Sequence, residues 1–207
     1  RAHTGAPIRD EPQFSTLRAI FEAALERIDP FGMITERVRL EGGRLVIELD
    51  QVRHEEELSR YSRVLVLGCG KASARMALAL EGILSGLPQG LKWGGLGCTK
   101  DGHTERLSRI GQVEAAHPVP DQAGVEAARR MAELARQADE NTLVLNLISG
   151  GGSALLPAPM RYRDAGREVA LTLEHKQAVT RALLACGADI REINCVRKHL
   201  SELKGGR

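Results

Sequence analysis

The chain has 207 residues, a formal net charge of +2, 43% hydrophobic and 27% charged residues, which are ordinary values for a globular protein with one core. The charges are interspersed, which does not suggest the clustered basic face of a nucleic-acid-binding protein, and no apolar run approaches the roughly 20 residues that span a bilayer. Aromatic residues make up only 3%, so Leu, Val, Ile and Ala must build the core, which suits helices packed on a parallel sheet.

The N-terminus and the cysteines indicate the compartment. Residues 1–13 lack the apolar stretch of a signal peptide, so we interpret them as a polar lead-in. The four cysteines form no CxxC pair, and their spacing in a chain of this size does not favour a disulfide framework. They are Cys69, Cys98, Cys186 and Cys195. We therefore expect a reducing environment and a cytoplasmic protein.

Two small elements are predicted first. Apolar residues recur at helical spacing over residues 14–28, and Asp29 and Pro30 end that helix. An alternating pattern interrupted by two glycines then predicts a small antiparallel hairpin at residues 38–49.

Strands and helices alternate in the next part of the chain. Apolar runs predict strands at residues 64–67, 96–99, 113–115 and 142–148. One helix is expected at residues 72–84, and another after Asp121, which could act as its N-cap. This order predicts an α/β fold with an open, mostly parallel, Rossmann-like sheet flanked by helices, the N-terminal helix and hairpin being additions to it.

Helical material closes the chain. We expect one helix at residues 169–184, terminated by Gly187, and another at residues 190–203, capped by Gly205 and Gly206. A C-cap normally leads into another element, so we expect the chain to stop within a fold.

The most informative segment follows the clearest strand and consists of Ser149, Gly150, Gly151, Gly152 and Ser153. Three consecutive glycines can adopt torsions closed to other residues, so successive N–H groups can converge on an anion. The serine hydroxyls add donors, and a helix starting near Ser153 would direct its positive end at the same point. A flexible connector is the alternative, but connectors rarely follow so apolar a strand. The segment therefore predicts an oxyanion site, most simply for phosphate.

A second turn from strand to helix contains Lys71. It is not a P-loop, because Ala72 follows the lysine and Val66 stands five residues before it. It is not a dinucleotide fingerprint either, because no acidic residue is evident near Thr99. A lysine at a helix start is disfavoured by the helix dipole, and such a placement indicates a function: Lys71 could neutralise phosphate or orient a carboxylate.

Other polar residues give weaker signals. Arg197, Ser201 and Lys204 would share one face of a helix, which fits a binding surface and a solvated helix equally well. His117 and His103 each lack a second ligand at metal-site spacing, so we assign no metal ligand, and we interpret the turn at His117 as a rigid one near the cleft. Nucleophilic hydrolysis is set aside, because the surroundings of Ser153 are not a G-x-S-x-G elbow.

Four motifs in order resemble glycerate 2-kinases of the type II, MOFRL-containing family. They are GKAS at residues 70–73, HPVPD at 117–121, SGGGSALL at 149–156 and NCVRKHLSELKGGR at 194–207. The resemblance covers most of the chain from about Leu17 onward.

This resemblance implies a two-domain α/β kinase that phosphorylates D-glycerate to 2-phosphoglycerate with ATP and Mg²⁺ in the cleft between its domains. It implies that Lys71 is the active-site lysine and that Ser149 to Ser153 form the phosphate or substrate loop. Arg197, Lys198 and Lys204 would belong to a signature helix near the cleft.

The chain departs from this family in length, since family members are about twice as long. We therefore expect residues 14–207 to be the N-terminal α/β domain of such a kinase, with a C-terminal domain missing. The Mg²⁺ ligands are then expected outside this chain, no general base can be named from the sequence, and the fragment alone could be inactive. The oligomeric state stays open, including a homo-oligomer.

Two other functions remain as alternatives. The chain could be a non-catalytic fragment that only binds an anion. It could also be a hydroxypyruvate reductase that uses NAD(P)H, as the G-x-G after a strand would allow, although the acidic ribose partner is missing.

Overall fold

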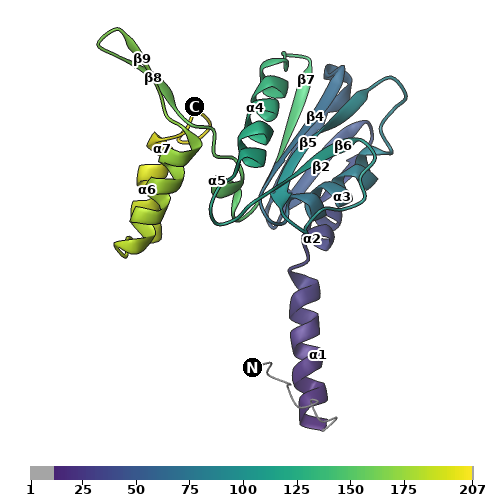
Figure 1. The fold of residues 1–207 in the computed structure, drawn as a ribbon. Helices are drawn as coiled ribbons and strands as arrows, with labels where there is room; N and C mark the ends of the chain where they lie inside the picture. Colours follow the sequence, from purple (N-terminus) through teal and green to yellow (C-terminus); the bar gives the residue numbers. More distant parts are fainter. Residues whose placement is uncertain (1–11, 207) are drawn as a thin grey trace.

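The computed structural model describes residues 12–206. Its centre is a parallel sheet of β4 (Arg63–Cys69), β5 (Lys92–Lys100), β6 (Ile110–Ala115) and β7 (Thr142–Ile148), in the order β6-β5-β4-β7 (Figure 1). All three strand pairs are parallel. The predicted α/β class and open parallel sheet are confirmed.

Helices cover both faces of this sheet, because alternate residues of the central strands point to opposite sides. Val64 and Val66 of β4 pack with the core under α3 (Ser73–Leu84). Leu67 of β4 packs with Leu96 of β5 under α4 (Gln122–Arg136). As predicted, Asp121 caps α4, its side chain accepting a hydrogen bond from the N–H of Gly124.

A small antiparallel sheet joins the α3 side. It contains β1 (Val38–Glu41), β2 (Arg44–Leu49) and β3 (Val52–Glu57), and it follows α2 (Pro30–Arg37). The predicted hairpin is confirmed as β1 and β2. The third strand was not predicted, because its sequence VRHEEE is charged and largely exposed and has no apolar alternation. A 3-10 turn, η1 (Leu58–Arg60), leads from it into β4.

The N-terminal helix α1 (Pro12–Arg27) confirms the helix expected at residues 14–28 and projects from the sheet (Figure 1). Its apolar side chains are 43% to 63% exposed. They belong to Phe14, Leu17, Ile20, Phe21 and Leu25. Residues 1–11 of the polar lead-in lie outside the described residues. No described helix is long and apolar enough to cross a membrane.

The C-terminal part stands beside the sheet and follows the short helix α5 (Gly152–Leu155) (Figure 1). It begins with a hairpin of β8 (Arg161–Asp164) and β9 (Arg167–Ala170), followed by α6 (Leu173–Ala185) and α7 (Ile190–His199).

Two helix boundaries predicted in this part were wrong. The helix expected from residue 169 begins at Leu173, because Val169 pairs in β9 and Thr172 forms a capping box with His175. Gly187 ends that helix region with a φ of 75°, as predicted. The last helix ends at His199 and not at residue 203, because Ser201 is fully buried and bridges to Pro159. Gly205 and Gly206 therefore do not cap it.

Candidate active site at the carboxyl ends of β4 and β7

The two loops singled out in the sequence meet at the point where the strand order reverses. From β4 the chain moves outward to β5 and β6, and then returns to place β7 on the other side of β4. Open α/β sheets bind ligands outside the carboxyl ends of the strands at such a switch point. The loop after β4 carries Lys71, and the loop after β7 runs from Ser149 to Ser153.

Hydrogen bonds fix these loops to one another. The N–H of Ser149 donates to the carbonyl of Cys69 at 2.9 Å, and the N–H of Lys71 donates to the carbonyl of Gly150 at 2.9 Å. The hydroxyl of Ser149 accepts from the N–H of Ala72 at 3.0 Å, ahead of α3. Ser149 therefore positions the loop, and its hydroxyl oxygen is already engaged as an acceptor.

The glycine loop leaves a run of donors unused. Within residues 12–206, the N–H groups of Gly150, Gly151, Gly152 and Ser153 make no hydrogen bond. Gly151 has a φ of 91°, in the region that favours glycine. Consecutive free N–H groups in such a turn form the concavity that binds anions. The following helix, α5, is only one turn long, so the expected helix dipole adds little and the loop itself supplies the donors.

Lys71 and His117 converge on this loop. A Cβ atom placed on Gly151 would lie 3.2 Å from Cε of Lys71, 3.1 Å from Cδ2 of His117 and 3.2 Å from its Nε2. The two side chains thus reach the same side of Gly151 from two different strand ends. The sequence alone had placed His117 only in a turn near the cleft.

His117 lies in positive surroundings. Burial lowers its pKa most, and the charges of Lys71, Lys100 and Arg197 lower it further. All of these favour the neutral imidazole. The His117–Pro118 peptide bond is cis. Lys100, at the end of β5, acts on His117 through its charge, which the sequence did not indicate.

The basic residues of the signature segment do not share one helix face. Because α7 ends at His199, Ser201 and Lys204 lie beyond it, and the predicted face of Arg197, Ser201 and Lys204 was wrong. Arg197 is half-buried and donates to the hydroxyl of Thr180 at 3.4 Å, and burial lowers the pKa of its guanidinium. Lys198 is exposed. Lys204 donates to the carbonyl of Leu156 at 2.6 Å and lies 3.4 Å from the hydroxyl of Ser201. Burial lowers the pKa of Lys204 to about 8. Lys204 therefore holds the C-terminal end of α5, whose first residues, Gly152 and Ser153, belong to the glycine loop.

One cavity joins the loop to this segment. It has a volume of about 680 Å³. Its lining includes Cys69, Ser149, Gly151, Gly152, Ser153, Asn194, Lys198 and Lys204. Gly152 is required there, because a Cβ atom on it would collide with the sulfur of Cys69. This cavity thus brings residues of the glycine loop together with Lys198 and Lys204, whereas Arg197 is not among its lining residues.

A further buried lysine was missed by sequence reasoning. Lys176 of α6 is 7% exposed and donates to the carbonyl of Leu200 at 2.8 Å. Burial lowers its pKa to about 8, and the charges of Lys204 and Arg197 contribute. Its hydrogen bond ties α6 to the end of α7. A lysine in a helical pattern gave no signal of this role.

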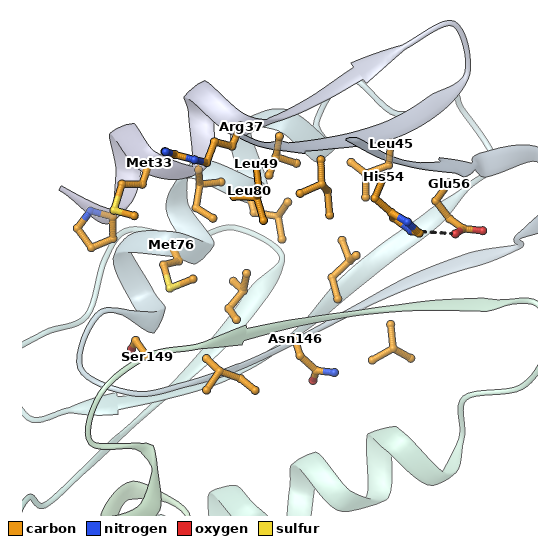
Figure 2. Close-up of a pocket in the computed structure, with 18 of the residues that line it drawn as sticks. Met33, Arg37, Leu45, Leu49, His54, Glu56, Met76, Leu80, Asn146 and Ser149 are labelled. Carbon is orange, nitrogen blue, oxygen red and sulfur yellow. Dashed lines mark ion pairs between the residues drawn. The ribbon is translucent and has the colours of Figure 1, made fainter. Parts of the chain in front are cut away.

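A second cavity of about 680 Å³ lies on the α3 side of β7 (Figure 2). Ser149 stands at one end of it, and the ion pair of His54 and Glu56, 3.5 Å long, stands at the other. Leucine, isoleucine, valine and methionine side chains make up most of the wall. Such a lining offers little for a phosphate, so the glycine loop remains the better anion site.

No metal site is apparent in the described part of the chain. Among residues 12–206 there is no group of three His, Cys, Asp or Glu residues that could hold a metal ion. His103 is exposed, its Nδ1 lying 3.0 Å from the carbonyl of Asp101. Mg²⁺ is commonly held by one or two carboxylates together with water and substrate phosphates, so the expectation that its ligands lie outside this chain stays a prediction.

Comparisons with known proteins agree with the resemblance seen in the motifs. A "Putative hydroxypyruvate reductase" of Agrobacterium vitis is 48% identical over 70% of this chain and 34% of its own length. A "Glycerate 2-kinase" of Pyrococcus horikoshii is 35% identical over 92% of this chain and 39% of its own length. The chain therefore spans between a third and two fifths of the length of these relatives.

A solved structure gives the same result. The crystal structure of a glycerate kinase of Thermotoga maritima is similar with a TM-score of 0.68 and 34% identity, over 95% of this chain and 41% of the other. The family model described as "Domain of unknown function (DUF4147)" matches residues 16–207. Since that match spans nearly the whole chain, the protein belongs to the DUF4147 family.

Proposed function

We propose that the protein is a glycerate 2-kinase that transfers a phosphoryl group from ATP to the 2-hydroxyl of D-glycerate. The observation that supports this most is the row of four free N–H groups at residues 150–153, facing Lys71 at the switch point of the sheet. Relatives named glycerate kinase share the fold and cover most of the chain. The proposal includes the cytoplasmic location expected from the sequence.

The chemistry asks little of the protein beyond positioning and charge. In phosphoryl transfer, negative charge is spread over the oxygens of the group in flight. The N–H groups of residues 150–153 would hold those oxygens, and the ammonium of Lys71 would balance their charge. Arg197 and Lys198, both on α7, would bind the carboxylate of glycerate or the phosphates of ATP. Lys204 would stabilise the loop through its hydrogen bond to the carbonyl of Leu156.

We further propose that this chain forms one side of the cleft. The relatives are longer, and the described residues contain no cluster of three potential metal-ligating side chains. The Mg²⁺ ligands would then lie elsewhere in the longer protein. ATP would enter from the open side of the glycine loop.

The reductase alternative fits the loop geometry less well. A dinucleotide site needs a glycine turn after β4 that a pyrophosphate can approach closely. Here the open face of Gly70 is filled by the backbone of Ser149. The name of the relative from Agrobacterium vitis nevertheless makes this alternative worth a direct assay.

Turnover and binding assays test these alternatives. Full-length protein supplied with D-glycerate, ATP and Mg²⁺ should release ADP and form 2-phosphoglycerate, which ³¹P NMR distinguishes from the 3-phosphate. Oxidation of NADH or NADPH with hydroxypyruvate, in place of phosphorylation, would overturn the proposal in favour of the reductase. Calorimetric binding of phosphate without any product would favour the anion-binding fragment.

The role of Lys71 has its own test. Replacing it by alanine should lower kcat by about 10²-fold or more, because an ordered positive charge at the transferred group is lost. Lys92→Ala serves as the control, because it removes a lysine from the amino end of β5, at the opposite edge of the sheet from the site. A Lys71→Ala variant with normal turnover would contradict the assignment.

A further inference from the structure

We propose that His117 is the general base that takes the proton from the substrate hydroxyl, an inference that rests on the proposed kinase function. The resemblance assigned no base to this chain. The substrate class would be a small hydroxy acid whose hydroxyl points at Nε2 of His117 while the phosphoryl group rests on the glycine loop.

The position of His117 supports this role. Its Nε2 and the Cε of Lys71 each lie 3.2 Å from the same point above Gly151, the centre of the row of free N–H groups. A group bound over this face of Gly151 would therefore be close to both the imidazole and the lysine. General bases act within about 2.6–3.2 Å of the proton-bearing atom or through one water, so a hydroxyl held at this loop is within reach.

The imidazole is also free to act. Within residues 12–206, neither ring nitrogen of His117 makes a hydrogen bond. The ring is only partly buried, so a substrate can reach it. The carboxylates three residues before and four residues after His117 are both engaged: Glu114 accepts from the N–H of Gly102, and Asp121 accepts from the N–H groups of Ala116 and Gly124.

The charges around His117 keep it in the basic form. The cations that act on it come from three elements: Lys71 before α3, Lys100 at the end of β5 and Arg197 of α7. Each of them disfavours imidazolium, as burial does. A neutral imidazole has one nitrogen with a free lone pair, which a general base requires.

The proposed step balances with ATP as the phosphoryl donor. The hydroxyl oxygen forms a bond to the γ-phosphorus while the bond from that phosphorus to its bridging oxygen breaks, and this electron pair leaves with the nucleoside diphosphate. The hydroxyl proton moves to Nε2 of His117. The surrounding cations then favour release of that proton to water, which restores the neutral ring.

The first test compares full-length parent protein with His117→Asn and His117→Ala. We expect kcat to fall by about 10²–10⁴-fold, with the KM values for D-glycerate and ATP changed by less than about threefold. The parent should lose kcat/KM as the pH falls through the pKa of His117, and this acid limb should be absent from the variants. His54→Asn, on the antiparallel sheet, is the matched control and should keep both the rate and the limb.

Two outcomes would overturn the base role of His117 and leave the proposed kinase function standing. One is an active parent whose His117→Asn variant keeps its rate, and the other is a slow variant that retains the acid limb. A parent that forms no phosphorylated product would instead contradict the proposed function, and the base role with it.

The second test needs no turnover. NMR can follow the titration of the His117 ring with and without inorganic phosphate, in protein whose binding of phosphate is measured by calorimetry. An anion on the glycine loop should raise the pKa of His117 by stabilising imidazolium, and His54 should not respond. Phosphate binding that leaves the pKa of His117 unchanged would show that the ring does not face the loop, and would overturn the proposal.

Discussion

Gly70 allows the two site loops to pack closely because it has no side chain. Its φ is 126°, and a Cβ atom there would lie 2.7 Å from the carbonyl carbon of Ser149. The loop after β7 can therefore approach the loop after β4 only if residue 70 has no side chain. The same contact brings Ser149 within reach of the N–H of Ala72.

Gly70→Ala should lower the free energy of unfolding by about 1–3 kcal/mol, because the substitution combines backbone strain with a backbone collision. It should also displace the glycine loop and reduce phosphate binding. Gly82→Ala is the matched control: Gly82 lies in α3 with open space where a Cβ would point, so alanine should stabilise by roughly 0.5–1 kcal/mol. Urea denaturation measures both. Equal effects of the two substitutions would contradict the steric account.

At the residue scale, the sequence singled out candidate site residues directly after apolar strands, but it did not indicate contacts that depend on packing. Lys71 and the loop 149–153 stand directly after apolar runs, so the sequence located them. His117 stands next to a proline in a polar turn, and only the arrangement of β6 beside β5 brings it to Gly151. The engagement of Lys204 with Leu156 likewise depends on a fold of the segment after α7 that no periodicity predicts.

At the scale of elements, the parallel strands were predictable because a strand that is buried on both faces has apolar residues at consecutive positions. The side chains of Val64, Leu65 and Val66 are fully buried. The antiparallel elements were harder. Strand β3 and the hairpin of β8 and β9 are largely exposed, so neither carries the apolar pattern on which the predictions relied.

Helix α7 depends on its capping box more than on its packing, since only Ile193 of its ten residues is buried. The Oδ1 of Asp189 accepts from the N–H groups of Arg191 and Glu192, at 2.7 Å and 3.0 Å, and Glu192 accepts in return from the N–H of Asp189 at 2.9 Å. This box orders the helix that carries Arg197 and Lys198.

Asp189→Ala should therefore cost about 1 kcal/mol and mostly loosen α7. Hydrogen exchange should speed up in residues 190–199 and stay unchanged in β4. Binding of phosphate or ATP should weaken if α7 contributes to the site. Arg191→Ala, which alters only an exposed side chain, is the control. Faster exchange spread evenly over the parallel sheet would show that the cap serves the whole fold and not this helix.

At the scale of the whole molecule, a formal charge of only +2 conceals a local concentration of positive charge. Lys71, Lys100 and the adjacent pair Arg197 and Lys198 come from three separated stretches of sequence, and the fold gathers them around the carboxyl ends of β4 and β7. Charge counted along the chain cannot reveal such a cluster, because it arises from the switch in strand order. A concave site of one sign attracts oppositely charged ligands and loses that attraction as salt rises.

The proposed substrates are both anions, so kcat/KM should fall severalfold as ionic strength rises from about 0.01 M to 0.15 M, where the screening length shortens from about 30 Å to 8 Å. Lys100→Gln should lower kcat/KM at low salt, leave kcat nearly unchanged and reduce the salt dependence, because Lys100 acts through its field on the site. It should also raise the pKa of His117, since one of the three cations that disfavour imidazolium is removed.

Lys92→Gln gives the matched comparison, since Lys92 and Lys100 begin and end the same strand and only Lys100 stands at the carboxyl edge. Steady-state kinetics across the salt series, together with NMR titration of His117, separate the two variants. If Lys92→Gln and Lys100→Gln change kcat/KM equally, net charge and not the focused cluster controls substrate capture. If only Lys100→Gln lowers kcat/KM, the positive charges gathered at the carboxyl edge of the sheet control substrate capture. The reversal of strand order then positions both the anion-binding loop and the charges that attract the substrates to it.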